Sequence, residues 1–220
     1  MSNPKSKSGP RCVALIGPYG SGKTLLLESI ATVTGAVTRK GSVSGGTSLG
    51  DFSTEARARQ MSVELNVLTT QYLGEDFTFL DCPGSIEFLA DTLNVLPAID
   101  AAIVVCEPEP AKVQMMRPFL KALSDAKVPH YLFVNKIEHA TGSLRDLLAL
   151  LQDASETPLL LRQIPIWENG IATGFGPAST IPAASRCASS TDRPAARRPS
   201  TCTAPSAGSA GIHTSIERPR

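Results

Sequence analysis

The residues best suited to chemistry lie close to the start of the chain, in the segment Gly17-Pro-Tyr-Gly-Ser-Gly-Lys-Thr24. This segment fits the phosphate-binding pattern G-x-x-x-x-G-K-[S/T], the P-loop. Its glycines permit a tight turn that brings backbone N–H groups close to phosphate oxygens. Lys23 is placed to reach the β- and γ-phosphates of a nucleotide, and the Thr24 hydroxyl is placed to coordinate Mg²⁺.

The surroundings of this segment separate a phosphate site from a Gly-rich turn that fits the pattern by chance. An apolar run over 12–16 precedes it, and a helix-like stretch over 25–30 follows it. A strand before and a helix after favour the phosphate site, because the helix adds its positive N-terminal end. The predicted phosphate-binding residues are Gly17, Pro18, Tyr19, Gly20, Ser21, Gly22, Lys23 and Thr24.

A second group of candidates concerns the metal ion and the γ-phosphate. Asp81 ends an apolar stretch, and an Asp at that position can hold Mg²⁺, usually through water. Gly84, three residues later, offers a backbone N–H that can approach a γ-phosphate. Ser62 follows a Gly/Ser/Thr-rich loop over 35–60 and offers a hydroxyl that can sense both groups. The predicted metal ligands are therefore Thr24, Ser62 and Asp81, although D-x-P-G alone is an ordinary turn.

The segment Asn135-Lys-Ile-Glu138 concerns the choice of base. It resembles the N-K-x-D motif with which GTPases read guanine, whose carboxylate accepts bonds from the N1–H and 2-amino groups. Adenine lacks this pair of donors, so such a site discriminates against it. Glu138 carries the right charge but is one methylene longer than Asp, which predicts reduced affinity. The alternatives are a polar cluster at a strand end, or an ATP-using enzyme that shares only the P-loop.

The elements that must position these groups alternate along the chain. We expect strands at 11–17, 62–70, 76–81, 101–107 and 130–135, and helices at 23–33, 86–97, 111–126 and 143–153. Short apolar strands that alternate with helices are typical of a parallel sheet covered on both faces. The predicted fold class is α/β, a three-layer P-loop NTPase sandwich of the G-domain type with a mostly parallel sheet.

The composition divides the chain of 220 residues into a tail at 1–10, a domain at 11–175 and a low-complexity segment at 176–220. The last segment has no Leu, Val, Phe, Tyr, Trp, Met or Lys, so we expect it to be disordered. A net charge of +1 gives no general attraction to DNA or a membrane. Five cysteines without metal spacing, and no signal-like segment, predict a cytoplasmic protein with reduced thiols. Nothing predicts the oligomeric state.

Taken together, these motifs resemble the G domain of the translation elongation factor G family, and most closely its elongation factor G-like paralogues. Asp81-Cys-Pro-Gly-Ser-Ile-Glu-Phe88 is similar to the family's D-T-P-G-H-x-D-F, and Tyr131-Leu-Phe-Val-Asn-Lys-Ile-Glu138 to its x-x-F-V-N-K-M-D. The segment 161–166 is similar to the strand that opens the family's insert. The resemblance implies binding of GTP or GDP with Mg²⁺, GTPase activity, and the ribosome as a partner.

Two departures from the family pattern bear on activity. Ser85 stands where the family has a His that positions the attacking water, so we expect slow hydrolysis, with Lys23 as the other catalytic candidate. The final strand, base-contacting loop and helix of the G domain are not recognisable in 176–220, so the fold is expected to be incomplete at its C-terminal end and translocation absent. We interpret 176–220 as an out-of-frame reading of a GC-rich gene. The alternative function is a non-functional truncated fragment.

Overall fold

The computed structural model describes residues 11–39, 41, 48–49, 56, 58, 61–140, 144–168, 171–178 and 212–215. The expected tail at 1–10 and most of 176–220 lie outside these residues. The strands are β1 (Arg11–Ile16), β2 (Asn66–Tyr72), β3 (Glu75–Asp81), β4 (Ala101–Cys106), β5 (His130–Val134), β6 (Leu160–Leu161), β7 (Gln163–Glu168), β8 (Ile171–Pro177) and β9 (Ile212–Ser215). The α-helices are α1 (Lys23–Val33), α3 (Leu89–Val95), α4 (Pro110–Gln114), α5 (Arg117–Asp125) and α6 (Leu144–Ala154).

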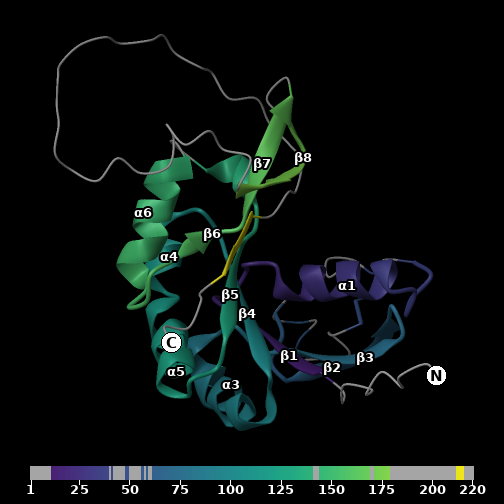
Figure 1. The fold of residues 1–220 in the computed structure, drawn as a ribbon. Coiled ribbons are helices and arrows are strands. Elements are labelled where there is room, and N and C mark those ends of the chain that lie inside the picture. The colour runs from purple at the N-terminus through teal and green to yellow at the C-terminus, as the bar shows by residue number, and fades with distance from the viewer. Residues whose placement is uncertain are drawn as a thin grey trace, which may run out of the picture.

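The central sheet has the strand order β2-β3-β1-β4-β5-β9-β6 (Figure 1). The pairs β1–β3, β1–β4 and β4–β5 are parallel, and β2–β3 is antiparallel. The carboxyl ends of β1, β3, β4 and β5 therefore meet at one edge, where an open α/β sheet usually places its ligand site. The expected α/β class with a mostly parallel sheet is confirmed.

Helices cover both faces of the sheet, so the side chains on both faces of the central strands are buried. Ala14 and Ile16 belong to a core cluster that also contains residues of α3, α4, α5 and α6. Leu15 between them is equally buried, and side chains alternate along a strand, so it points to the opposite face. That face is covered by α1, which contacts β1, β2 and β3 and buries Leu27 and Ala31 (Figure 1).

Several expected elements differ in their bounds for clear physical reasons. The expected helix 111–126 is divided into α4 and α5, because a proline ring at position 118 cannot sit in the middle of a helix. The expected helix 86–97 becomes a 3-10 turn, Ile86–Phe88, then α3, then a second 3-10 turn, Leu96–Ala98. β2 begins four residues later than expected and ends in a tight turn at Leu73 and Gly74, whose φ values are 52° and 81°.

Two findings at the C-terminal side depart from the expectation. β7 and β8 form a separate antiparallel hairpin, and β8 continues to Pro177, across the expected boundary at 175. β9 lies within the segment expected to be disordered, yet it pairs antiparallel with β5 and with β6 (Figure 1). The edge of β5 that faces away from β4 is therefore paired, although the fold was expected to be incomplete at its C-terminal end.

Candidate functional site

The P-loop joins β1 to α1 at the edge where the parallel strands end. Gly22 is the residue before α1 and adopts a left-handed conformation with φ 94° and ψ 25°. No side chain caps this helix end, and its first turn contains no acidic residue. The first N–H groups of α1 are therefore presented by the backbone alone, which is the arrangement that binds phosphate at helix N-termini.

Close contacts around the loop require residues without a β-carbon. A β-carbon at Gly17 would lie 2.1 Å from the carbonyl oxygen of Val105, and one at Gly22 would lie 2.3 Å from Nδ2 of Asn135. One at Gly84 would lie 2.3 Å from Nζ of Lys23. The P-loop is thus in direct contact with β4, with the segment after β5 and with the segment after β3.

Lys23 lies inside this arrangement, with only 6% of its surface exposed. Its ammonium donates hydrogen bonds to the carbonyl oxygens of Gly17 at 2.9 Å and Pro18 at 3.1 Å. Burial lowers the pKa of Lys23 from its usual value, while the nearby Asp81 carboxylate acts in the opposite direction. The ammonium is therefore held at the loop by two carbonyl groups, and the charge of one nearby carboxylate favours its protonated form.

The three predicted metal ligands converge beside α1. Thr24 Oγ1 donates a hydrogen bond to Oδ2 of the fully buried Asp81 at 2.8 Å, and it lies 3.2 Å from Oγ of Ser62. All three are hard oxygen ligands, which suit Mg²⁺. Within the described ranges, no group of three His, Cys, Asp or Glu residues could hold a metal instead.

The residues of the predicted base-reading segment lie against the other side of the P-loop. Asn135 donates from Nδ2 to the carbonyl oxygen of Ser21 at 2.9 Å. Lys136 adopts φ 53° and donates from Nζ to the carbonyl oxygen of Gly20 at 3.0 Å. Glu138 is half-buried in a 3-10 turn, Ile137–His139, and its Oε2 atom is buried with no hydrogen-bond partner among the described residues.

A nucleotide carrying Mg²⁺ fits these residues on three observations. The N–H groups at the start of α1 have neither a side-chain cap nor an acidic residue in the first turn. The hydroxyl of Ser21, a residue only 1% exposed, has no hydrogen-bond partner within the described part of the chain, and neither has Oε2 of Glu138. Buried polar atoms normally have partners, so these two atoms mark places where a ligand can supply them.

Sequence reasoning missed one member of the site, Glu107. This residue directly follows β4, is largely buried, and accepts a hydrogen bond from Lys136 Nζ at 2.8 Å in an ion pair. It therefore orients the lysine that braces the P-loop. The signal was present, because an acidic residue at the end of a buried parallel strand lies at the same edge as the other candidates.

Ser85 lies after Gly84 at the start of the 3-10 turn, half-buried, with φ −74° and ψ 142°. Its side chain makes no capping hydrogen bond.

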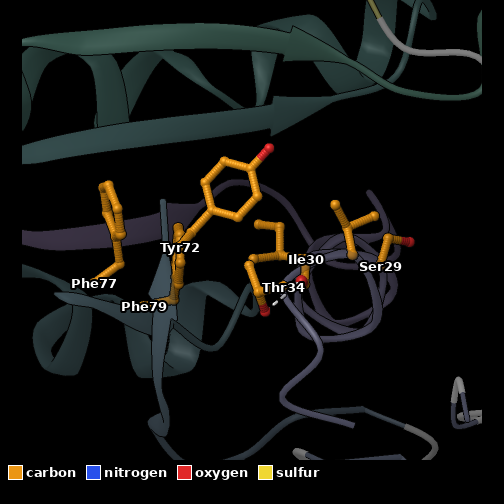
Figure 2. Close-up of a pocket in the computed structure, with 7 residues that line it drawn as sticks. Ser29, Ile30, Thr34, Tyr72, Phe77 and Phe79 are labelled. Atoms are coloured by element: carbon orange, nitrogen blue, oxygen red, sulfur yellow. Dashed lines mark hydrogen bonds between the residues drawn. The ribbon is translucent and has the colours of Figure 1, made fainter. Parts of the chain in front are cut away.

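An apolar surface hollow of about 370 Å³ lies away from the candidate site, between α1 and the β2–β3 hairpin (Figure 2). Its apolar lining consists of Ile30, Val33, Tyr72, Phe77 and Phe79.

No helix within the described ranges has the length and apolar character needed to cross a membrane.

A family model described as the Elongation factor Tu GTP binding domain matches residues 9–192. An elongation factor G-like protein from Synechocystis sp. is 43% identical over 175 residues, which is 80% of this chain and 26% of that protein. An elongation factor G-like protein from Mycobacterium tuberculosis is 31% identical over 157 residues, which is 71% of this chain and 22% of that protein.

A crystal structure of a Thermus thermophilus protein superposes with a TM-score of 0.65 at 29% identity, covering 75% of this chain and 25% of the other. The chain thus spans about a quarter of the length of the curated relatives it matches. The family match includes the P-loop, the segment around Asp81 and the segment Asn135–Glu138, all of which meet at one edge of the sheet. On this combination of sequence and geometry, the chain belongs to the elongation factor Tu GTP-binding domain family.

Proposed function

We propose that this chain binds GTP and GDP together with Mg²⁺ and hydrolyses GTP slowly. The observation that carries the proposal is the convergence of two groups of residues on one loop. Thr24, Ser62 and Asp81 lie together on one side of the P-loop. Asn135 and Lys136 donate to carbonyl groups of the same loop on its other side. One compact ligand can therefore engage both groups.

Each residue has a role that follows from its contacts. The N–H groups of the loop and of the first turn of α1 bind phosphate oxygens, as helix N-termini do. Lys23 neutralises phosphate charge, and Thr24, Ser62 and Asp81 hold Mg²⁺, which supplies charge neutralisation to the phosphates when it is bound. Glu138 accepts from the donor edge of guanine, which gives its buried Oε2 the partner it lacks within the described chain.

Slow hydrolysis follows from residue 85. Phosphoryl transfer is catalysed mainly by positioning and electrostatics, so a water-positioning group matters. Ser85 can donate or accept one hydrogen bond to a water molecule, but its side chain is shorter than an imidazole and carries no charge. We therefore expect Ser85→His to raise kcat by roughly 100-fold, the low end of the usual contribution of one proton-handling group.

Titration with a fluorescent GTP analogue tests the proposal directly. We expect Mg²⁺-dependent binding that GTP and GDP reverse at lower concentration than ATP. Equal competition by ATP and GTP would remove the guanine assignment and favour an ATP-using P-loop protein. If folded protein bound neither nucleotide in the presence of Mg²⁺, the chain would be a fragment without nucleotide function.

A matched pair of variants adds a control for the metal site. Thr24→Ala removes an oxygen from the proposed Mg²⁺ ligands and should weaken binding only when Mg²⁺ is present. Thr32 lies on the same helix, and among the described residues its hydroxyl bonds only to the carbonyl oxygen of Glu28, so Thr32→Ala is the control. It should leave the affinity unchanged. Equal loss in both variants would indicate damage to α1 and not loss of a ligand.

A role in protein synthesis is a further part of the proposal, supported by the names of the relatives. Two of these relatives are elongation factor G-like proteins about four times as long as the matched segment. We expect cosedimentation with ribosomes that depends on GTP over GDP, and no translocation activity by this chain alone. Cosedimentation that ignores the nucleotide would separate ribosome binding from the GTP site.

A further inference from the structure

A lysine from a different element, α4, lies close to Gly20 in the middle of the P-loop. Lys112 belongs to α4, and its Nζ atom lies 3.9 Å from the point where a side chain at residue 20 would begin. Residue 20 is glycine, so no side chain stands between this ammonium and the loop. The P-loop pattern places no requirement on α4, and the sequence alone does not indicate this approach.

The topology explains why α4 reaches the loop. β4 is the parallel neighbour of β1, so the segment that leaves β4 runs beside the loop that leaves β1. Glu107 in this segment forms an ion pair with Lys136, whose Nζ bonds to the carbonyl oxygen of Gly20. α4 begins three residues after Glu107. Gly20 therefore lies between two ammonium groups. Lys136 bonds to its carbonyl oxygen, and Lys112 lies close to the position that a β-carbon would occupy.

The partners of the three lysines around the loop differ. Lys23 bonds to carbonyl oxygens of Gly17 and Pro18, and Lys136 bonds to Gly20 and to Glu107. Lys112 is only half-buried and forms no hydrogen bond or ion pair with any residue that the structure describes. Like charges close together are unfavourable, and an anion bound among them removes the repulsion.

We propose that Lys112 is a phosphate-contacting residue of the nucleotide site, which acts on the triphosphate beside Lys23. This inference rests on the proposed function and specifies one of its contacts. Lys112 supplies its positive charge from α4, outside the P-loop itself. Its ammonium lies beside Gly20, so the triphosphate is held between Lys23 at the start of α1 and Lys112 of α4.

Calorimetric titration with inorganic tripolyphosphate and with GTP, both with Mg²⁺, tests this contact. Lys112→Met keeps the length of the side chain and removes its charge. We expect it to weaken both ligands by about tenfold, which corresponds to one charge-assisted hydrogen bond at a partly exposed position. Lys112→Arg keeps the charge and should stay within about threefold of the wild type, because either cation can contact a phosphate oxygen.

Lys121→Met is the matched control, because Lys121 is an exposed lysine on the neighbouring helix α5 and the charge change is the same. It should leave both affinities unchanged. Affinity of Lys112→Met within twofold of the wild type, or equal losses in the two Met variants, would overturn the inference. Binding of tripolyphosphate but not GTP by the wild type, with a loss in Lys112→Met, would reject the guanine proposal and keep Lys112. Binding of neither ligand would reject both.

Discussion

The two sides of the candidate site differ in how completely their own residues partner one another. On the phosphate side, Lys23, Thr24 and Asp81 are joined by hydrogen bonds or held by loop carbonyls. On the base side, Asn135 and Lys136 are bonded to the P-loop, but Glu138 has a buried oxygen without a partner in the described chain. Apart from the hydroxyl of Ser21, the phosphate side is therefore preorganised, whereas the base side depends on its ligand for the hydrogen bond of the Glu138 carboxylate.

This difference teaches which property each side controls. A preorganised set of charges gives affinity for any triphosphate, because it needs little rearrangement on binding. A buried acceptor without a partner gives selectivity, because only a ligand with a matching donor removes the cost of leaving it unpaired. Changes on the phosphate side should alter binding of all nucleotides, and changes at Glu138 should alter the ratio between them.

The largest expected effect comes from Lys23→Met. This change removes a buried ammonium that the loop holds in place, and with it about two charge-assisted hydrogen bonds worth roughly 1.5–3 kcal/mol each. We expect affinity for GTP, GDP and ATP to fall together by roughly 1,000-fold in a fluorescence titration. A loss confined to GTP would contradict the assignment of this side to phosphate alone.

Gly17→Ala should disrupt the packing of the P-loop against β4. The new β-carbon would meet the carbonyl oxygen of Val105 at 2.1 Å, and the backbone has φ 148°. We expect the free energy of unfolding to fall by about 3 kcal/mol, from overpacking and backbone strain together. Urea denaturation measures this change, and Gly35→Ala is the control. Gly35 has φ 76° but open space around it, so it reports the strain without the clash.

Glu138→Asp sharpens the comparison, because it changes the base side without changing its charge. The shorter side chain matches the N-K-x-D form of the motif. We expect GTP affinity to rise by about fivefold, near 1 kcal/mol for one better hydrogen bond, and ATP affinity to stay unchanged. Competition titrations give both values. A parallel gain for ATP would mean that this carboxylate does not face the base, and Glu138→Gln should lose the preference for guanine.

The last expected effect concerns stability and not binding, and it involves His130, at the start of the strand that leads to the base side. His130 is buried and burial lowers its pKa from 6.5, although a hydrogen bond to the Val128 carbonyl opposes this. The native state therefore binds fewer protons than the unfolded chain below pH 6.5. Stability is complete above that pH and decreases as the pH falls toward the lower native pKa, by at most about 1.4 kcal/mol per pH unit.

Urea midpoints between pH 7.5 and pH 5 test this expectation for His130. His130→Gln should reduce the dependence on pH, and His139→Gln should preserve it, because His139 is exposed on the turn after β5. An identical pH profile in both variants would place the acid sensitivity elsewhere in the chain.

The sequence predicted which candidate residues lie close together better than it predicted the C-terminal part of the fold. The candidates lie within a few residues of buried strand ends, and the parallel order of β1, β3, β4 and β5 brings strand ends together. Local spacing was therefore enough to assemble them. The ion pair of Glu107 with Lys136 needed knowledge of which strands are neighbours. Pairing of β9 with β5 joins segments far apart in the chain, and four residues carry too little pattern to reveal such a partner.

The close approach of residue 84 to the loop has a mechanical consequence. A β-carbon at Gly84 would lie 2.8 Å from the carbonyl oxygen of Gly17 and 2.3 Å from Nζ of Lys23. Two backbones packed so tightly are obliged to shift as a pair. The segment after β3 therefore cannot move toward the P-loop without meeting the Lys23 ammonium, and the same segment carries the exposed side chain of Ile86 two residues after Gly84. The exposed surface at Ile86 is thus only two residues away from the point where the segment after β3 meets the P-loop.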